Sequence, residues 1–348
     1  MHIQLNSRNK TYRFEALQGE PILYAGMRQG LELPYGCATG TCGTCRVKRI
    51  AGGLHNHWPE APGMQEARPG EYEFLMCQCT PVDDLIVETK ATVYRTDPGA
   101  CLPKYVEGLV STMPELARDV MEFSIDLDSE MNFEAGQFVA LRIPGVVGYR
   151  VYSMTNFERA ARRLEFLVRR KPNGLFSAHL FNASCNGQRI QIFGPLGRAI
   201  FSPRDARNLL IIAGGSGIAG MMSILSRATE EGYFERHLGH VFFGVRAWAD
   251  TFYLDQLSKM KENTARDRLK VTVALSDEEV PASANALYPA LAFARGLVHE
   301  VAAQFMAGQY ANTRAYVAGP PPAVDASLRF LLREAKLSPG EIRYDKFG

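Results

Sequence analysis

The run CATGTCGTC is the feature that most constrains how this chain can fold, because it places Cys37, Cys42 and Cys45 within nine residues. Thiols this close together can ligate a metal centre or form a disulfide, and the backbone has to be shaped around either one. A fourth thiol comes from Cys77 or Cys79 further along the chain. The spacing C-x4-C-x2-C, completed by one distant cysteine, is the ligand spacing of one class of [2Fe–2S] cluster.

Two glycines in this run favour such a cluster over other metal sites. Gly40 and Gly43 permit backbone conformations in which N–H groups point at negatively charged sulfur atoms. Zinc sites more often have paired C-x2-C knuckles, whereas this sequence has one C-x2-C and one C-x-C. A Rieske centre would need two histidine ligands, and no C-x-H partner stands near these cysteines. The sequence therefore predicts a [2Fe–2S] electron carrier.

Composition and charge exclude several other classes of protein. All of the seven cysteines except Cys101 and Cys185 fall in two clusters. In a reducing compartment such clustering favours metal ligation over disulfides. The first residues alternate like a strand and lack the apolar core of a signal peptide. No run of about 18 apolar residues predicts a membrane helix. A net charge of +2 with mixed signs makes nucleic acid a poor partner, so we expect a cytoplasmic protein that binds neither nucleic acid nor membrane.

The length of 348 residues allows two or three domains. Residues 1–95 predict a small α+β domain, in which short alternating strands surround one helix in EPILYAGMRQG. Residues 96–104, TDPGACLPK, combine proline, glycine and small side chains without periodicity, which is typical of a linker.

Two different strand patterns follow the linker. Residues 105–204 hold short alternating runs such as VMEFSIDL and QRIQIFG, which predict an antiparallel β-barrel or sandwich. Residues 205–348 hold almost continuously apolar runs, NLLIIAG, HVFFGVR, LKVTVALS and RAYVAG, with helical segments between or after them. We expect a parallel α/β sheet there, with a ligand at the carboxyl ends of its strands.

A strand in the second region carries groups that suit a flavin. In GYRVYSMTN, the Arg150 guanidinium can clamp a pyrophosphate, the Tyr152 ring can stack on an isoalloxazine, and the Ser153 hydroxyl can hydrogen-bond the N5 edge. Downstream, Gly174 and Ser177 lie at an expected helix start, where amide groups face a phosphate. Taken alone, the pattern R-x-Y-S is equally compatible with an ordinary strand.

The third region begins with LLIIAGGSGIAG, in which a strand leads through glycines into a helix. Gly214, Gly215 and Gly217 would let the backbone approach a pyrophosphate closely, and Gly220 completes the pattern G-x-G-x-x-G.

Residues 1 to about 90 resemble a plant-type ferredoxin, through LPYGCATGTCGTC and the later FLMCQCTPVDDLIVE. In ferredoxins the fourth ligand precedes a short stretch that ends in proline, and Pro81 follows Cys77 by four residues. The resemblance therefore selects Cys77 as the fourth ligand, and it implies that Cys79 is a buried thiol outside the cluster.

Residues 105–348 resemble the ferredoxin–NADP reductase superfamily, with R-x-Y-S in a FAD-binding barrel, then G-G-x-G-I-A and G-P-P in a nucleotide domain. The whole chain resembles the reductase component of bacterial multicomponent oxygenases that act on aromatic compounds. This implies that electrons pass from NADH to FAD, and then singly through the cluster to an oxygenase component. That partner would use Rieske or di-iron chemistry, reached directly or through a separate ferredoxin, and we expect the reductase to be a monomer.

The family's functional residues fall on specific positions of this chain. Tyr152, Ser153 and Phe347 would lie nearest the reacting flavin, Phe347 because family members often end in an aromatic residue. The chain departs from the family at Gly220, where proline is common, and at Ala318, where a cysteine commonly lies near the nicotinamide. Hydride transfer would then rely on the shape of the site.

Two loops bear on the coenzyme. YVAGPPPAV ends an apolar strand in Gly319 and Pro320, and its prolines make the turn rigid. VFFGVRAWADTFYLDQL ends another strand with Arg246 and Asp250. Asp250 could accept hydrogen bonds from a ribose 2′-hydroxyl and would repel a 2′-phosphate, whereas Arg246 could attract one. Because an aspartate near this position tends to accompany NADH in related reductases, we expect NADH.

Two other functions stay open at this point. Reductases that serve a deoxysugar dehydratase share this domain order, and a chain with a cluster could act as a redox sensor without turnover. The segment HNHWPEAPG, residues 55–63, resembles part of toluene-type monooxygenase reductases. Because His55 and His57 have no third ligand nearby, we expect an exposed loop that can touch a partner, not a metal site.

Overall fold

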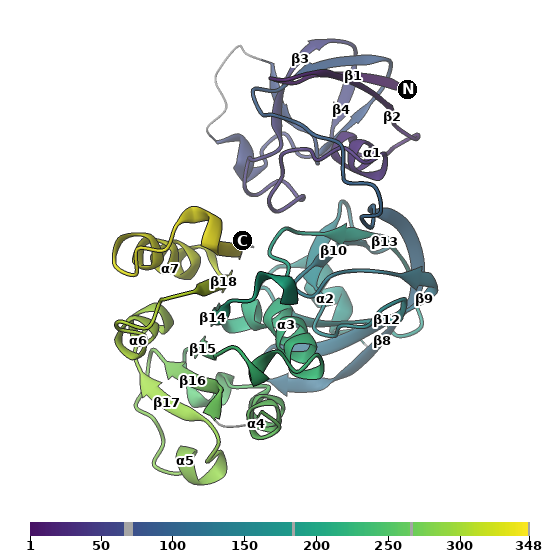
Figure 1. The fold of residues 1–348 in the computed structure, drawn as a ribbon. Helices are drawn as coiled ribbons and strands as arrows, with labels where there is room; N and C mark the ends of the chain where they lie inside the picture. Colours follow the sequence, from purple (N-terminus) through teal and green to yellow (C-terminus); the bar gives the residue numbers. More distant parts are fainter. Residues whose placement is uncertain (66–71, 183–184, 265–266, 347–348) are drawn as a thin grey trace. The chain divides into compact units, whose positions relative to one another are not determined.

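The computed structural model describes residues 1–65, 72–182, 185–264 and 267–346 (Figure 1). Its internal contacts divide the chain into two compact units. The first contains Met1–Gly108, Val139–Val151 and Arg189–Leu196, and the second contains Leu109–Phe138, Tyr152–Gln188 and Gly197–Gly348. The ferredoxin-like region therefore shares a unit with segments of the region that was predicted as a barrel.

The ferredoxin-like region folds as a five-stranded mixed sheet with one helix (Figure 1). The strand order is β2-β1-β7-β3-β5, with β1 (His2–Asn6), β2 (Thr11–Glu15), β3 (Arg46–Ala51), β5 (Glu73–Leu75) and β7 (Leu85–Glu88). β1 pairs antiparallel with β2 and parallel with β7. A separate two-stranded ladder joins β4 (Leu54–Asn56) to β6 (Cys79–Pro81). Alternate side chains of β2 are buried, as its alternating sequence predicts.

The helix expected in EPILYAGMRQG is α1 (Ile22–Arg28), and it is buried on almost every side. Residues 22–27 are all buried, which is the environment expected for a helix that is apolar all round. The chain leaves the helix through Gly30, whose φ of +77° is one that glycine adopts without strain. Helix α1 therefore has neighbours on more than its sheet-facing side.

The second region forms a six-stranded sheet in the order β11-β10-β13-β8-β9-β12. Its strands are β8 (Lys104–Ala117), β9 (Val120–Met131), β10 (Phe138–Arg142), β11 (Arg150–Ser153), β12 (Ala161–Arg169) and β13 (Arg189–Leu196). β9 and β12 pair antiparallel along almost their whole length. The short helix α2 (Leu175–Leu180) lies between β12 and β13 in sequence. The runs predicted as strands in this region are confirmed as strands.

The third region is a parallel sheet in the order β17-β16-β15-β14-β18-β19, and every neighbouring pair is parallel. Its strands are β14 (Asn208–Gly214), β15 (Gly239–Val245), β16 (Leu269–Leu275), β17 (Ala292–Arg295), β18 (Thr313–Gly319) and β19 (Ile342–Lys346). After β14 the chain builds the sheet outward in one direction, and it then returns to place β18 on the other side of β14. The carboxyl ends of β14 and β18 therefore mark a topological switch point, where open parallel sheets bind ligands.

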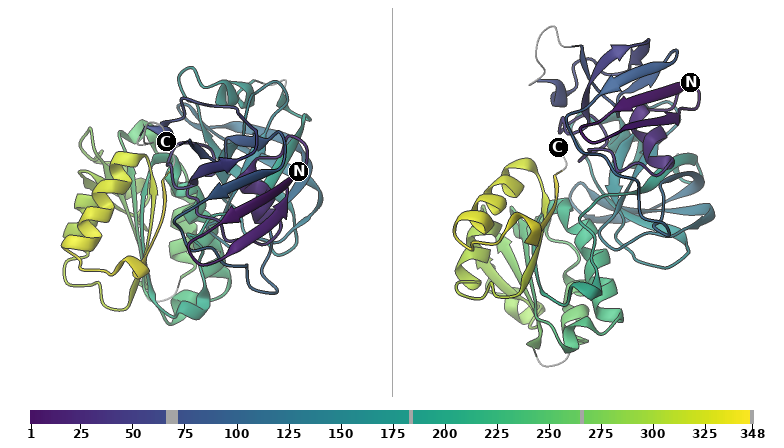
Figure 2. Two further views of the ribbon diagram at one scale, coloured as in Figure 1. Left: turned by 90° about the horizontal axis from the view of Figure 1, so that it is seen from above. Right: turned by 45° about the horizontal axis from the view of Figure 1, so that its top comes forward.

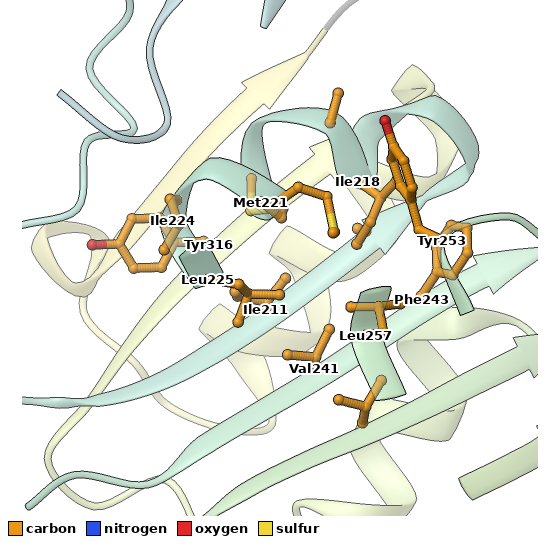
Figure 3. Packing of buried hydrophobic residues seen from close by; sticks show 14 of the residues in the cluster. Ile211, Ile218, Met221, Ile224, Leu225, Val241, Phe243, Tyr253, Leu257 and Tyr316 are labelled. Carbon is orange, nitrogen blue, oxygen red and sulfur yellow. The ribbon is translucent and has the colours of Figure 1, made fainter. Parts of the chain in front are cut away.

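Helices cover both faces of the parallel sheet (Figure 2). They are α3 (Ile218–Glu230) and α4 (Leu254–Glu262) on one face, and α6 (Val298–Phe305) and α7 (Pro321–Arg333) on the other, with the single turn α5 (Ala284–Leu287) before β17. In Figure 3, Ile218, Met221 and Leu257 of the first pair belong to the same core as Ile211 and Phe243 of the sheet. The predicted parallel α/β region is confirmed.

Within the second unit, Arg227 joins α3 to the end of the six-stranded sheet. Its guanidinium bonds Glu231 at 2.9 Å, contacts Glu134, and lies 4.6 Å from the centre of the Phe157 ring. Only 7 % of the Arg227 side chain is exposed. A buried guanidinium that is paired with two carboxylates has few alternative arrangements. Arg227 therefore holds α3 against the loops that follow β9 and β11.

Two segments differ from what their sequences suggested. HNHWPEAPG is exposed over most of its length, as expected, but it is not a loop throughout, since its first two residues belong to β4 and its last two to the short 3-10 helix η1 (Pro62–Met64). GPPPAV is more than a rigid turn, because Pro321 and Pro322 open helix α7, where their missing N–H groups would have no helical partner. Among the described residues, no helix has both the length and the apolar character needed to cross a membrane.

Candidate cofactor sites

The loop that carries three of the cysteines turns backbone N–H groups toward sulfur. Gly40 and Gly43 have φ angles of +98° and +74°, which make the loop tight enough for this. Cys37 Sγ accepts three backbone N–H groups, from Thr39 at 3.5 Å, Thr41 at 3.2 Å and Cys42 at 3.3 Å. Such a concave group of N–H donors stabilises negative charge on sulfur.

The four predicted ligands come together as two pairs. The backbone N–H groups of Cys37 and Cys42 each donate to the other residue's sulfur at 3.3 Å, and Cys45 Sγ lies 3.3 Å from Cys77 Sγ. Within the described residues, no three histidine, cysteine or acidic side chains surround one point. A zinc ion needs four ligands at one centre, whereas each iron of a two-iron cluster takes two thiolates. The donor set therefore fits a [2Fe–2S] cluster better than a single metal ion.

The environment of Cys37 stabilises its ionised form. A hydrogen bond from the Cys42 thiol, helped by backbone N–H groups, lowers the pKa of Cys37 to about 4. Cys79 is fully buried on β6, and burial raises its pKa to about 12. The loop thus favours a thiolate at Cys37, the form that binds iron, whereas the neighbouring thiols and burial raise the pKa of Cys42 and Cys77, as burial does that of Cys79. Cys42 is exposed, whereas Cys37, Cys45 and Cys77 are buried.

His55 and His57 lie on and just after β4, which pairs with the strand that begins at Cys79. β4 pairs with β6 so that His55 lies opposite Thr80, next to Cys79. The His57 Nε2 atom lies 3.1 Å from Thr80 Oγ1, and the two histidine rings meet edge to face with centroids 4.5 Å apart. Burial lowers the pKa of His57. Both histidines are exposed, and in this structure their side chains contact each other and Thr80.

Gly63 of η1 packs against the loop that carries Cys37, Cys42 and Cys45. Its N–H donates to the Gly40 carbonyl at 2.9 Å. A Cβ atom placed on Gly63 would lie only 2.5 Å from the Gly43 nitrogen, so no larger residue fits while the loop keeps its shape. Nothing in the spacing of the cysteines pointed to Gly63, although it lies in the segment that drew attention for its histidines.

Tyr24 of α1 was also missed in the sequence. Its hydroxyl donates to the Ala38 carbonyl, inside the ligand loop, at 3.1 Å. Its ring stacks on Phe193 of β13 at 4.3 Å and 11°, and it meets the edge of Tyr149 at 5.1 Å. The signal available in the sequence was the apolar character of α1 on all sides, which requires a second packing surface.

The residues expected around a flavin lie on and beside β11. The Tyr152 ring stacks on Phe176 of α2 at 5.4 Å and 27°, and it meets Phe123 edge to face. Arg150 is exposed, and its guanidinium donates to the Tyr149 carbonyl at 3.0 Å. A strand that presents a guanidinium, a phenol ring and a hydroxyl in succession has the groups that a flavin and its pyrophosphate require.

Gly220, where the chain departs from the resembled family, lies against Ser153. A Cβ atom on Gly220 would lie 3.3 Å from Ser153 Cβ and 3.5 Å from its hydroxyl oxygen. The glycine therefore lets α3 approach β11 closely, which is a packing reason for its presence.

The predicted helix start near Gly174 is confirmed, since Gly174 precedes the first residue of α2. Ser177 is buried, and its hydroxyl accepts the Lys171 N–H at 3.0 Å and donates to the Gly174 carbonyl at 3.1 Å. This hydroxyl shapes the turn before the helix. The phosphate-binding role of Gly174 and Ser177 stays a prediction.

Four residues of the two glycine motifs meet at the switch point between β14 and β18. A Cβ atom on Gly217 would lie 2.5 Å from the Ala318 carbonyl carbon, and one on Gly319 would lie 3.0 Å from the Gly214 carbonyl oxygen. A Cβ atom on Gly214 would lie 3.3 Å from Cδ of the Pro320 ring. Glycines thus allow the two loops to touch through their backbones at the switch point, where open parallel sheets bind ligands.

Asp250 and Arg246 follow the neighbouring strand β15, and the Asp250 carboxylate has two hydrogen-bond donors. One of its oxygens accepts the Ala247 N–H at 3.2 Å, and the other accepts Arg118 at 3.3 Å. Arg246 is exposed. Arg118 lies in the turn between β8 and β9, and the sequence gave no sign that it would meet Asp250.

Phe347 lies outside the described residues. The last strand, β19, places Asp345 opposite Ala318, next to the G-P-P loop. Burial raises the pKa of Asp345 to about 7. This buried carboxyl group was also missed, because nothing in YDKFG distinguishes it from a surface residue.

Comparison with known domain families matches three parts of the chain in order. Residues 5–82 match the 2Fe-2S iron-sulfur cluster binding domain. Residues 108–201 match the oxidoreductase FAD-binding domain, and residues 211–328 match the oxidoreductase NAD-binding domain.

Proteins with known roles match the chain over nearly its whole length. The ferredoxin–NAD(+) reductase component of an alkene monooxygenase system from Xanthobacter autotrophicus is 32 % identical, over 96 % of this chain and 97 % of that protein. The reductase component of naphthalene 1,2-dioxygenase/salicylate 5-hydroxylase systems from Ralstonia is 31 % identical, over 94 % of both chains. Among solved structures, the ferredoxin reductase in carbazole 1,9a-dioxygenase has a TM-score of 0.81 and 28 % identity, covering 100 % of this chain and 99 % of that chain.

Proposed function

The chain belongs to the family of ferredoxin–NAD(P)⁺ reductase components of oxygenase systems, and from this premise we propose that it carries electrons from NADH to an oxygenase component of an aromatic hydroxylation system. FAD and a [2Fe–2S] cluster are its cofactors, in keeping with its three matched domains. Bound flavin supplies the conversion between hydride transfer and single-electron transfer.

The cluster is assigned to the two cysteine pairs. Cys37 and Cys42 hold one iron, and Cys45 and Cys77 hold the other, which is supported by their pairwise approach. The N–H groups around Cys37 offset the negative charge of the thiolates. Cys42 is the exposed ligand, so the edge of the loop nearest to it is where an electron leaves for the partner.

The flavin is assigned to β11 and its surroundings. Arg150 pairs with the pyrophosphate, Tyr152 covers the ring system, and Ser153 donates to the N5 edge. Gly174 and Ser177 support the start of α2. Phe347 is proposed to cover the flavin, from the family's common terminal aromatic residue. No general acid is needed for hydride arrival at N5, and none is assigned.

The coenzyme is assigned to the switch point. Gly214, Gly215 and Gly217 allow the pyrophosphate to approach the backbone, and Gly319 and Pro320 shape the nicotinamide end.

NADH is the proposed coenzyme, because Asp250 presents a carboxylate beyond the end of β15. A 2′-phosphate would be repelled there, whereas a ribose hydroxyl could donate to it. Arg118 shares this carboxylate and Arg246 lies four residues earlier, so discrimination between NADH and NADPH is expected to be moderate.

We also propose the finer organisation of the chain. Residues 1–95 form a β-grasp-like ferredoxin domain, 96–104 a linker, 105–204 an antiparallel FAD-binding barrel and 205–348 the NADH domain. Each matched family lies inside one of these ranges. The protein acts as a cytoplasmic monomer, and its partner is a Rieske or di-iron oxygenase reached directly or through a separate ferredoxin.

The observation that carries this proposal is the pair-by-pair meeting of four cysteines in a chain that also has a nucleotide switch point. The test is anaerobic titration of the purified protein with NADH, followed by visible and EPR spectra. We expect flavin bleaching and then the signal of a reduced cluster, with rapid NADH-dependent reduction of cytochrome c. A protein that binds both cofactors but shows no such turnover would favour the sensor alternative. Reconstitution with oxygenases encoded beside it, scored by product formation, then identifies the partner and separates it from a dehydratase.

A further inference from the structure

Tyr24 touches both the ligand loop and the barrel strands of the first unit. We propose that Tyr24 is a positioning residue that holds the cysteine loop against β13, and that it thereby sets the rate at which the cluster receives electrons from the flavin. The inference rests on the proposed function, because it assumes that both cofactors are bound.

The contacts of Tyr24 leave it little freedom. Its side chain is 0 % exposed. The ring lies almost parallel to Phe193, with centroids 4.3 Å apart, and the Tyr149 ring meets it at 75°. Offset stacking and edge-to-face contacts are the favourable arrangements for aromatic rings. A tyrosine of the ferredoxin-like region is therefore enclosed by two aromatic residues of the second region, Phe193 on β13 and Tyr149 just before β11.

The hydroxyl adds a connection that stacking alone would lack. It donates to the carbonyl of Ala38, which lies between the paired ligands Cys37 and Cys42. Ala38 has a φ of +56°, a left-handed conformation that is unfavourable for alanine. A hydrogen bond from a fixed donor helps to keep that residue, and with it the loop, in place.

A neighbouring polar contact fixes the same interface. Arg28 pairs with the buried Glu20 through two bonds of 3.0 Å. Tyr105, at the start of β8, also bonds Glu20, and its ring lies 4.8 Å from Phe193. Burial is the main cause of the raised pKa of the Tyr105 hydroxyl, and the negative charge of Glu20 raises it further. Glu20, just before α1, thus joins Arg28 at the end of the helix to Tyr105 of β8, and Tyr24 lies between Glu20 and Arg28 in the sequence.

The step affected is the transfer of one electron from reduced flavin to the oxidised cluster. No covalent bond forms or breaks, and Tyr24 is neither oxidised nor deprotonated. Its role is to keep the cysteine loop in one arrangement, because the rate of transfer between fixed cofactors depends steeply on their separation and orientation.

Three variants test the proposal in the full-length holoenzyme. Tyr24→Phe keeps the ring and removes the hydroxyl, whereas Tyr24→Leu removes both the stacking and the hydrogen bond. Phe193→Leu weakens the stacking from the barrel side and keeps the inference testable if Tyr24→Leu does not fold. Tyr12→Phe is the matched control, because the buried Tyr12 hydroxyl donates to the Val93 carbonyl at 2.6 Å in the same region.

Stopped-flow absorbance with NADH resolves flavin reduction from cluster reduction, and amide hydrogen exchange reports on residues 22–28 and 189–196. For Tyr24→Leu and Phe193→Leu we expect unchanged flavin reduction, cluster reduction slowed about tenfold or more, and faster exchange in both segments. Tyr24→Phe should show a smaller slowing, and Tyr12→Phe none.

Wild-type cluster reduction in a folded Tyr24→Leu variant would overturn the inference. So would an equal slowing by Tyr12→Phe, since that would reflect general loosening of the ferredoxin-like region. Failure of NADH to reduce the flavin in the wild-type protein would instead refute the proposed function.

Discussion

Cys45 Sγ and Cys77 Sγ lie 3.3 Å apart although they are 32 positions apart in the sequence. Their approach follows from strand pairing, because β3 begins directly after Cys45 and β5 ends shortly before Cys77. Arg46 lies opposite Leu75 in that antiparallel ladder, and the Met76 N–H donates to the Cys45 carbonyl at 3.2 Å. The register of two strands therefore brings the distant cysteine to the loop.

Replacing Cys77 by serine should abolish the cluster, because it removes one member of the second pair. Cys77→Ser is expected to lose the visible absorbance and the iron of the cluster, while keeping flavin reduction by NADH. Cys79→Ser should retain the cluster, since Cys79 is buried on β6 and belongs to neither of the two cysteine pairs. Iron content and visible spectra of both purified variants decide the matter, and the reverse pattern would move the fourth ligand to Cys79.

Gly63→Ala should damage the same site from outside the ligand set. Its Cβ would approach the Gly43 nitrogen to 2.5 Å, so the backbone must shift. We expect a loss of about 1–3 kcal/mol in the free energy of unfolding and a lower iron content. Gly340→Ala is the control, because a Cβ there would have no neighbour nearer than 4.0 Å. Equal behaviour of the two variants in thermal unfolding and iron assays would contradict this reading of Gly63.

Asp250→Ala should lower kcat/KM for NADH about tenfold and leave the value for NADPH nearly unchanged, because only the ribose hydroxyl gains from the carboxylate. The control is Arg118→Ala, which removes the ion pair with Asp250 but leaves the carboxylate in place. If Arg118→Ala reproduced the loss of NADH activity, the effect would belong to the ion pair and not to coenzyme recognition.

Asp345 should make the stability of the protein depend on pH. Burial raises its pKa from an ordinary value near 4 to about 7, so the folded state holds a proton that the unfolded chain releases earlier. The stability that this group provides is fully present below about pH 4 and is lost as the pH rises through about 7.

Asp345→Asn removes that titration with little change in shape. At pH 8 we expect the variant to be more stable than the wild type by about 1–3 kcal/mol, with the difference vanishing near pH 4. Chemical unfolding at a series of pH values measures this. Parallel profiles for the two proteins would show that Asp345 is not the responsible group.

Local sequence patterns were sufficient where the relevant contacts are local. The tight loop of Gly40 and Gly43 was predictable from the residues, and so was the strand-to-helix turn at Gly217. The helix start at Gly174 was predictable too. The hydrogen bonds of the Ser177 hydroxyl to the backbone of Lys171 and Gly174 were not, because they depend on how the turn before the helix folds. For Asp250 the carboxylate was visible in the sequence, but its neighbour Arg118 comes from a distant hairpin.

The sequence by itself determined which chemical groups are available: the thiols and glycines of CATGTCGTC and the side chains of R-x-Y-S. It also determined the periodic spacing of apolar residues that predicts strands and helices. These follow from covalent spacing and from backbone preferences, which act between near neighbours. Only the tertiary structure decided that Cys45 meets Cys77, that Gly63 closes on Gly43, and that Tyr24 stacks on Phe193. Those contacts depend on strand register and on the packing of distant surfaces, which no local pattern encodes.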